Sequence, residues 1–290
     1  MFLARIIILT SFITTACAMD PNTIDRLRNA LQQEDPFYYN LDTTVYPAKD
    51  DNADVMVYLH SSSGNSTELA SVYRRGVLPH HLVTFNMPDA NCTFNSNDTL
   101  SFGTIEELLP ALYIIKTCVV GAQVSTIHVC GFSAGGGALI NLLKILNTSK
   151  YDDELAHIGI TTTDKQTMLA AIQRGHVILH CPLRSVEEVI AFRGSNEILE
   201  KLAHQYDKHD LRPIDSACDL EGLKLTLILH FQINDEILSN RDDKILYFNL
   251  SNAIATAQGK VVLIVGNDGG HNAPYHASLW HGYQKFVNTR

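Results

Sequence analysis

The sequence predicts an α/β fold with a mostly parallel central sheet and helices on both faces. Apolar runs without polar interruption, such as VMVYLH at 55–60 and LTLILHF at 225–231, are typical of strands buried on both faces. Segments with apolar residues at helical spacing, such as 104–120, separate these runs. The chain has 290 residues, 46% of them apolar, which is enough for one large core. We therefore expect a single domain over 19–290.

The expected elements alternate along the chain. Strands are expected at 41–47, 55–60, 81–86, 126–132, 176–181, 225–231 and 261–265. Helices are expected at 21–33, 68–75, 104–120, 138–146, 165–173, 241–257 and 275–287. The connection at 183–223 is unusually long and carries two more helical patterns, at 186–192 and 197–205. We interpret it as a small helical cap involved in substrate selection, with a plain crossover as the alternative.

A glycine-rich turn around Ser133 is the strongest chemical signal. Gly131 to Gly135 read G-x-S-x-G, with β-favouring residues before them and a helical pattern after them. A side chain at the apex of so sharp a turn needs neighbours without bulk. The apex also lies at a helix N-terminus, where free amides and the helix dipole stabilise an oxyanion. Ser133 is the predicted nucleophile, and the amide of Ala134 is a predicted oxyanion-hole donor.

The loop after the strand at 55–60 is the second candidate element. It reads HSSSGN over 60–65 and lies where an acyl-transfer enzyme needs its second oxyanion donor. We predict that the amide of Ser62 is this donor, with Ser61 as the alternative. The same pattern is compatible with a plain loop whose serine caps the following helix.

Two further strand ends supply an acid and a base. Asp235 and His271 each follow a predicted strand, and the carboxyl ends of strands in open α/β sheets form the ligand-binding edge. An imidazole can take the serine proton and return it to the leaving group, while a carboxylate on its other nitrogen fixes the tautomer. We therefore predict a catalytic site of Ser133, Asp235 and His271. Glu236 and Asp268 are alternative acids.

These motifs resemble those of the α/β-hydrolases, and among them secreted esterases of the dienelactone-hydrolase and polyhydroxybutyrate-depolymerase-like type. The resemblance covers roughly 55–287 and is carried by the turn around Ser133, the loop after His60, DEIL at 235–238 and GGH at 269–271. It implies the α/β-hydrolase fold and the family order of serine, acid and histidine.

Two positions depart from the family pattern. The usual His-Gly dipeptide at this strand end is His60-Ser61 here, after the strand at 55–60, and a serine in place of the glycine could narrow the predicted oxyanion loop. The family's acid falls four residues after the histidine of its strand, and that position holds Asn234. Asp235 therefore needs one extra loop residue to reach the histidine.

The predicted activity is a serine hydrolase that cleaves small-molecule or acyl carboxylic esters through an acyl-enzyme intermediate. A thioesterase or a serine peptidase would use the same residues, and a non-catalytic binding protein on the same scaffold is an alternative of another class. No cofactor is expected. The sequence has no H-E-x-x-H, paired His/Asp cluster or C-x-x-C, so no metal site is expected either.

The first 18 residues have the pattern of a secretory signal peptide, with Arg5, an apolar run at 6–13 and small residues at 16–18. The apolar run is too short for a lasting membrane anchor. We expect cleavage after Ala18 and a secreted or periplasmic protein. Lipid attachment at Cys17 is the alternative, although Thr14 is a poor fit to a lipidation signal.

The charge, the cysteines and the sequons indicate which partners and covalent modifications to expect. The net charge of -9 and the absence of a basic run argue against nucleic acid or an anionic membrane as a partner. The oligomeric state leaves no sequence signal. Cys130 and Cys181 are expected in buried strands, whereas Cys92 or Cys118 could pair with Cys218. Sequons that a eukaryotic secretory host could glycosylate are at Asn65, Asn91, Asn97, Asn147 and Asn249.

Overall fold

The structure is a computed structural model that describes residues 22–32, 41–51, 53–62, 64–88, 101–238, 240–271 and 276–288. Several predictions fall outside these residues: the signal peptide at 1–18 with Cys17, the cysteine Cys92, and the sequons at Asn91 and Asn97. None of the helices within the described residues is long and apolar enough to span a membrane.

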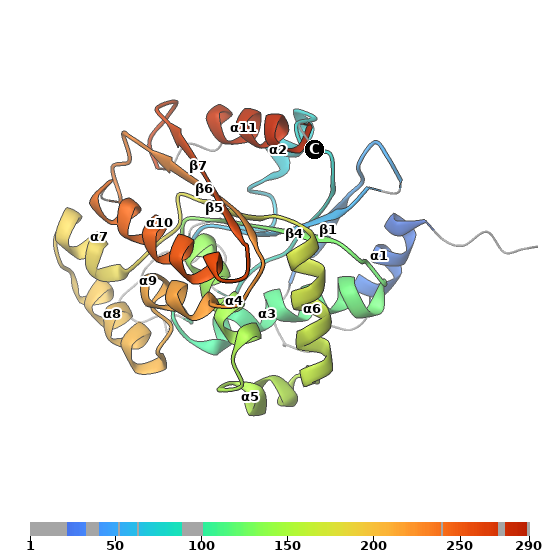
Figure 1. The fold of residues 1–290 in the computed structure, drawn as a ribbon, viewed down its shortest axis with the longest axis horizontal. Helices are drawn as coiled ribbons and strands as arrows, with labels where there is room; N and C mark the ends of the chain where they lie inside the picture. Colours follow the sequence, from blue (N-terminus) through green and yellow to red (C-terminus); the bar gives the residue numbers. More distant parts are fainter. Residues whose placement is uncertain are drawn as a thin grey trace, which may run out of the picture.

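A seven-stranded sheet forms the centre of the molecule, with strand order β1-β3-β2-β4-β5-β6-β7 (Figure 1). β1 pairs antiparallel with β3, and the other pairs are parallel. This arrangement confirms the predicted mostly parallel sheet. The strands are β1 (Thr44–Tyr46), β2 (Val55–Leu59), β3 (His81–Thr84), β4 (Ile127–Phe132), β5 (Val177–His180), β6 (Thr226–Gln232) and β7 (Lys260–Gly266).

Helices cover both faces of the sheet, as predicted (Figure 1). One face is covered by α2 (Ala70–Arg74) and α11 (Ala277–Asn288), whose apolar residues join one core cluster. The other face is covered by α1 (Thr23–Leu31), α3 (Ile105–Lys116), α4 (Ala134–Asn147), α6 (Thr162–Arg174) and α10 (Asn240–Ala255). A π-helical turn, Thr117–Gly121, extends α3, and α5 (Asp152–His157) is a short helix that the sequence did not predict.

Alternate side chains of each central strand enter the two cores. In β2, Val55, Val57 and Leu59 contact the larger core, while Met56 and Tyr58 contact the core beneath α11. All five are buried, which explains why the strand has no polar alternation.

The segment at 183–223 divides into two parts. α7 (Val186–Arg193) and α8 (Glu197–His209) pack on each other at one edge of the molecule, whereas α9 (Pro213–Ser216) and the 3₁₀ turn Ala217–Leu220 pack on α4 and α10 (Figure 1). Arg184 fixes the base of this segment: it is fully buried and forms ion pairs with Glu188 and with Asp243 of α10.

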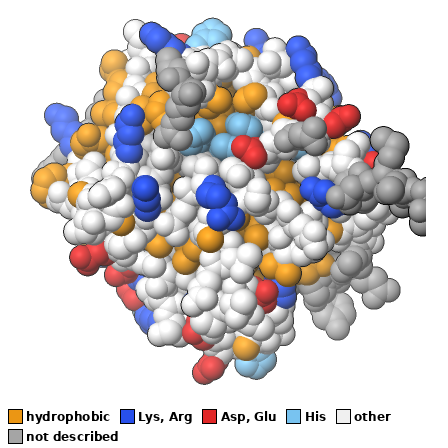
Figure 2. Space-filling model, turned by 45° about the vertical axis from the view of Figure 1, so that its right-hand side comes forward, with side chains coloured by type: hydrophobic (Ala, Val, Ile, Leu, Met, Phe, Trp, Pro, Cys, Tyr) orange, Lys and Arg blue, Asp and Glu red, His pale blue; other side chains and the backbone are white. Residues whose placement is uncertain are grey.

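The cysteines differ from one sequence prediction. Cys118 is buried and unpaired, and Cys218 is exposed and unpaired. The bridge suggested between these two residues is therefore wrong, because one thiol lies inside the core and the other at the surface. Cys130 and Cys181 are buried, as predicted. On the face shown in Figure 2, basic and acidic side chains are interspersed without a single-sign patch.

A cluster of buried histidines lies beside α11 at the start of the central strands. The His80 ring stacks on His128 at 3.9 Å between centroids, and its Nε2 lies 2.6 Å from the Tyr283 hydroxyl. Burial, together with the neighbouring imidazoles of His128 and His176, lowers the pKa of His80 to about 2. His80 is therefore neutral in the folded protein.

We predict that this neutral histidine makes the fold acid-sensitive. An unfolded histidine has a pKa of about 6.5. Below that pH only the unfolded chain binds the proton, so stability is lost as the pH falls from about 6.5, by up to about 1.4 kcal/mol per pH unit for one such group. His80→Gln keeps a hydrogen-bonding group for Tyr283 but does not titrate.

Urea unfolding of both proteins at about pH 7.5 and about pH 5 tests this prediction. The wild-type protein should lose roughly 2 kcal/mol more than His80→Gln between the two pH values. An equal loss in both proteins would show that His80 does not contribute.

Candidate active site

Ser133 lies at the apex of the turn between β4 and α4, with a backbone φ of 53°. This conformation is costly for a residue with a side chain and is found mainly where the surroundings impose it. A Cβ at Gly131 would collide with the carbonyl of Gly135, and a Cβ at Gly135 would collide with the carbonyl of His60. Close backbone contacts on both sides therefore explain why the turn requires these two glycines.

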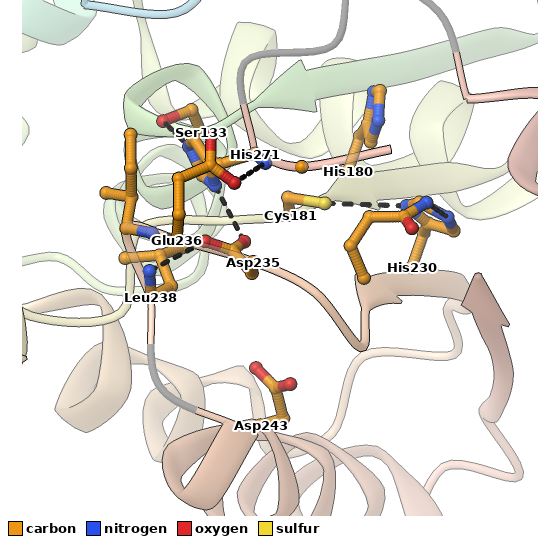
Figure 3. Close-up of polar contacts among 12 residues, drawn as sticks. Ser133, His180, Cys181, His230, Asp235, Glu236, Leu238, Asp243 and His271 are labelled. Carbon is orange, nitrogen blue, oxygen red and sulfur yellow. Dashed lines mark hydrogen bonds and ion pairs between the residues drawn. The ribbon is translucent and has the colours of Figure 1, made fainter. Parts of the chain in front are cut away.

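The structure brings the three predicted site residues together (Figure 3). His271 Nε2 lies 2.7 Å from Ser133 Oγ, and His271 Nδ1 lies 2.8 Å from Asp235 Oδ2. Since a carboxylate can only accept, Nδ1 carries the proton and Nε2 is free to accept the serine proton. Both His271 and the Asp235 side chain are buried, at 2% and 6% exposure.

The carboxylate is held in its charged form. Burial opposes the ionisation of Asp235, but the hydrogen bond and electrostatic attraction of His271 and the amides of Leu238 and Ile237 outweigh it, so the pKa of Asp235 lies below its usual value. The two amides donate to Oδ1 at 2.7 and 2.8 Å, respectively. An ionised Asp235 can stabilise the imidazolium that forms when His271 takes a proton.

The two alternative acids have other partners. Glu236 accepts the backbone N–H of His271 at 2.8 Å. Asp268 accepts the backbone N–H and the hydroxyl of Ser278, at 2.8 and 2.7 Å. In this geometry the imidazole contacts Asp235, despite the extra loop residue.

The loop after β2 reaches the same site. Glu68 accepts the amide of Ser61 at 2.8 Å and its hydroxyl at 2.5 Å, so the amide of Ser61 already has a partner. Ser62 is partly exposed and lines the same cavity as Ser133. Glu68 binds the amide of Ser61 and not that of Ser62. Ser62 is therefore the better placed of the two predicted donors to face a ligand.

The starts of α4 and α2 bear on the predicted donor Ala134 and on the alternative interpretation of the loop at 60–65. Ala134 is the first residue of α4, and the first amides of a helix have no partner within it. The alternative in which a serine caps the helix after the loop is wrong, because Leu69 is the N-cap residue of α2 and no side chain caps it.

His60 and Glu68 hold the shape of the loop. His60 Nδ1 donates to the Ser61 carbonyl at 2.7 Å, and its Nε2 accepts the Met87 amide at 2.8 Å. Tyr58 Oη also donates to Glu68, at 2.8 Å. Sequence reasoning overlooked Glu68; its only signal was an acidic residue in a short loop-to-helix segment otherwise rich in small residues.

A cavity of about 510 Å³ opens beside Ser133 and His271. Its other walls come mainly from α7, α8 and the end of the loop at 235–238. Phe102, which precedes α3, also contributes. Among the described lining residues there is no Asp, Glu, Lys or Arg; the apolar ones include Phe102, Leu183, Val186, Leu199, Leu202 and Leu238.

Comparison with models of protein families and with the sequences of curated proteins gives no match. Solved structures do match the fold. A carboxylesterase from Lactobacillus plantarum is 14% identical with a TM-score of 0.56, and the match covers 79% of this chain and 79% of that one. An esterase from Thermogutta terrifontis is 12% identical with a TM-score of 0.55 and coverages of 85% and 86%.

The acylaminoacyl peptidase of Pyrococcus horikoshii is also similar, with 15% identity and a TM-score of 0.54. The match covers 85% of this chain but 38% of the peptidase, so the chain corresponds to little more than a third of that protein. Together these matches show that the chain has the α/β-hydrolase fold.

We predict that Ser133 is a reactive nucleophile. A fluorophosphonate should add to Ser133, because His271 can take its proton as the bond to phosphorus forms. Asp235→Asn should slow the labelling by roughly 10³- to 10⁴-fold, since an amide at that position favours the wrong tautomer of His271. Intact mass and peptide mapping measure the adduct.

Glu236→Gln is the matched control, because glutamine can still accept the His271 amide, and it should label nearly as fast as wild type. If Glu236→Gln were the slow variant and Asp235→Asn the fast one, Glu236 would be the acid.

A second prediction concerns the loop after β2. Glu68→Gln leaves one acceptor oxygen where the carboxylate satisfied the Ser61 amide, the Ser61 hydroxyl and Tyr58. The loop should shift and misplace the Ser62 amide, lowering kcat for an activated ester by roughly 10-fold or more with little change in KM. Glu154→Gln, at an exposed position of α5, is the control. An unchanged kcat in Glu68→Gln would show that Glu68 does not position the loop.

Proposed function

We propose that this protein is a serine hydrolase that cleaves carboxylic esters through an acyl-enzyme intermediate. The observation that carries this proposal is the hydrogen-bonded chain from Ser133 through His271 to Asp235 beside an apolar cavity. We assign Ser133 as nucleophile, His271 as general base and acid, and Asp235 as the group that orients the imidazole.

The reaction proceeds in two halves. Ser133 Oγ attacks the ester carbonyl while His271 Nε2 takes its proton, and the resulting oxyanion is bound by the amides of Ala134 and Ser62. His271 returns the proton to the departing alcohol, which leaves an acyl group on Ser133. Water, deprotonated by His271, then attacks this acyl group and releases the acid.

The cavity favours uncharged substrates. A space of about 510 Å³ with apolar walls fits an aliphatic or aromatic group of the ester, and the described residues that line it offer no Asp, Glu, Lys or Arg to pair with a charged group. The esterases of similar fold support an ester as the scissile bond. The similar fold of the acylaminoacyl peptidase makes a peptide substrate the second candidate to test.

Export to an extracellular or periplasmic compartment is part of the proposal. It is supported by the charge, apolar run and small residues at positions 1–18. The mass of the mature chain, isolated from its native host, would show whether cleavage follows Ala18 or whether lipid is attached at Cys17.

The experiment that tests the activity compares wild type with Ser133→Ala on p-nitrophenyl esters of graded acyl length, then on thioesters and peptides. Wild type should hydrolyse esters fastest, and Ser133→Ala should lose roughly 10³- to 10⁶-fold in kcat with its circular dichroism unchanged. Normal turnover by Ser133→Ala would overturn the mechanism. If well-folded wild type showed neither turnover nor a fluorophosphonate adduct, the alternative of a non-catalytic binding protein would replace the hydrolase proposal.

A further inference from the structure

Three histidines and a cysteine meet directly beneath the candidate active site. His180 and Cys181 come from the end of β5, His230 from β6, and His276 from the residue before α11. One nitrogen or sulfur atom from each side chain lies within 4.8 Å of the corresponding atoms of the other three. All four residues are buried, at 0 to 4% exposure.

The side chains converge from different directions. The ring centroids of His180, His230 and His276 lie 4.8 to 5.3 Å apart in each pair. Cys181 Sγ points at His230 Nδ1, 3.6 Å away (Figure 3). Cys181 has a backbone φ of 42°, an unfavourable conformation for a residue with a Cβ and one that recurs where a side chain is held for function.

We propose that His180, Cys181, His230 and His276 form a tetrahedral site for a zinc ion that fixes the loops carrying Asp235 and His271. Thiolate and imidazole are the ligands that zinc prefers in protein sites.

The distances between the ligand atoms are close to those of a tetrahedral zinc site. With Zn–S of about 2.3 Å and Zn–N of about 2.0 Å, adjacent sulfur and nitrogen ligands of a tetrahedron are about 3.5 Å apart. Cys181 Sγ and His230 Nδ1 already have nearly this separation, at 3.6 Å. His180 Nε2 and His276 Nδ1 lie 2.5 Å apart and need to separate by less than about 1 Å.

Outer hydrogen bonds prepare His276 as a ligand. Its Nε2 lies 2.9 Å from the Gly270 carbonyl, which can only accept, so Nε2 carries the proton and Nδ1 presents a lone pair. Metal-binding histidines commonly donate their second N–H to a carbonyl or carboxylate in this way. Gly270 directly precedes His271, so this bond also links the cluster to the proposed catalytic base.

His230 has a similar outer partner. Its Nε2 lies 3.0 Å from Ser278 Oγ and 3.1 Å from Gln232 Nε2, and the Ser278 hydroxyl donates to Asp268 at 2.7 Å. When Nδ1 binds the ion, Nε2–H can donate to Ser278, with the carboxylate of Asp268 behind it. The Gln232 amide must then turn its Oε1, which is buried without a partner among the described residues, toward this N–H. The third imidazole, His180, has no such outer partner: its Nδ1 is buried and makes no hydrogen bond with the described residues.

Binding is balanced in protons and charge. The ion displaces the thiol proton of Cys181 and binds three neutral imidazoles, so one proton is released and the site gains one positive charge. Asp235 and Asp268 are close enough to act electrostatically on Cys181 and His276, so their negative charges favour the added positive charge. The site has no position for substrate, so the proposed role of the ion is structural.

Metal analysis of the purified full chain is the first measurement. The wild-type protein, loaded with zinc and dialysed, should retain about one zinc per chain. Replacement with cobalt should give the visible spectrum of a tetrahedral site and a thiolate-to-cobalt charge-transfer band in the near ultraviolet. Zinc removal should lower the thermal midpoint, and zinc return should restore it.

Variants assign the ligands. Cys181→Ser should lose the charge-transfer band, while Cys218→Ser, the exposed cysteine outside the cluster, should keep it. His230→Gln should lose the tetrahedral spectrum and provides the same evidence if Cys181→Ser does not fold. Fluorophosphonate labelling is recorded in parallel, so a failure of the zinc site and a failure of the hydrolase proposal are distinguishable.

Two outcomes overturn the proposal. One is a wild-type protein that is folded and retains no zinc or cobalt after dialysis. The other is a bound metal whose spectrum is unchanged in Cys181→Ser or is lost in Cys218→Ser.

Discussion

The backbone of Ser133 is the constraint on which the rest of the site depends. Its amide donates to the carbonyl of His180 at the end of β5, and its carbonyl accepts the amides of Gly136, Gly137 and Leu183. The turn is therefore tied to the neighbouring strand, to its own helix and to the start of the segment that carries α7. A residue with φ of 53° persists because these bonds define its position from several sides.

This constraint also explains where polar side chains gather in an apolar sheet. β4, β5 and β6 are parallel, and Phe132 at the end of β4 pairs in register with His180 at the end of β5, which pairs with His230 near the end of β6. Residues at these strand ends therefore meet in layers. Phe132 separates two such layers: its ring lies 5.6 Å from that of His271 and 4.5 Å from that of His180. The upper layer contains the proposed triad, and the lower layer contains the His/Cys cluster.

The sequence carried enough information for the elements and for much of the site, because those signals are local. Uninterrupted apolar runs marked the strands, and Gly131 to Gly135 marked the turn at Ser133. The cluster around Cys181 could not be predicted in this way, since its members come from three segments and only strand order and register bring them together. The role of Glu68 was hidden for a related reason: it acts on the backbone of Ser61, and backbone partners leave no pattern in a sequence.

The pair Asp235 and Glu236 shows how an irregular loop can still give a regular site. The acid lies one residue later than the resemblance implies, but Asp235 Oδ1 accepts two following amides, and this tight turn aims Oδ2 at the imidazole. Glu236 holds the backbone of His271 instead, in a space that a Cβ on Gly270 would fill.

The two carboxylates therefore act on different parts of the same histidine. Asp235 sets the tautomer and orientation of the ring, while Glu236 sets the position of the chain that carries it. The orientation of an imidazole depends on both its ring partner and its backbone. The loop with the extra residue therefore uses two acids, Asp235 on the ring and Glu236 on the backbone of His271. The DEIL sequence at 235–238 is thus explained by geometry at each of its two acidic positions.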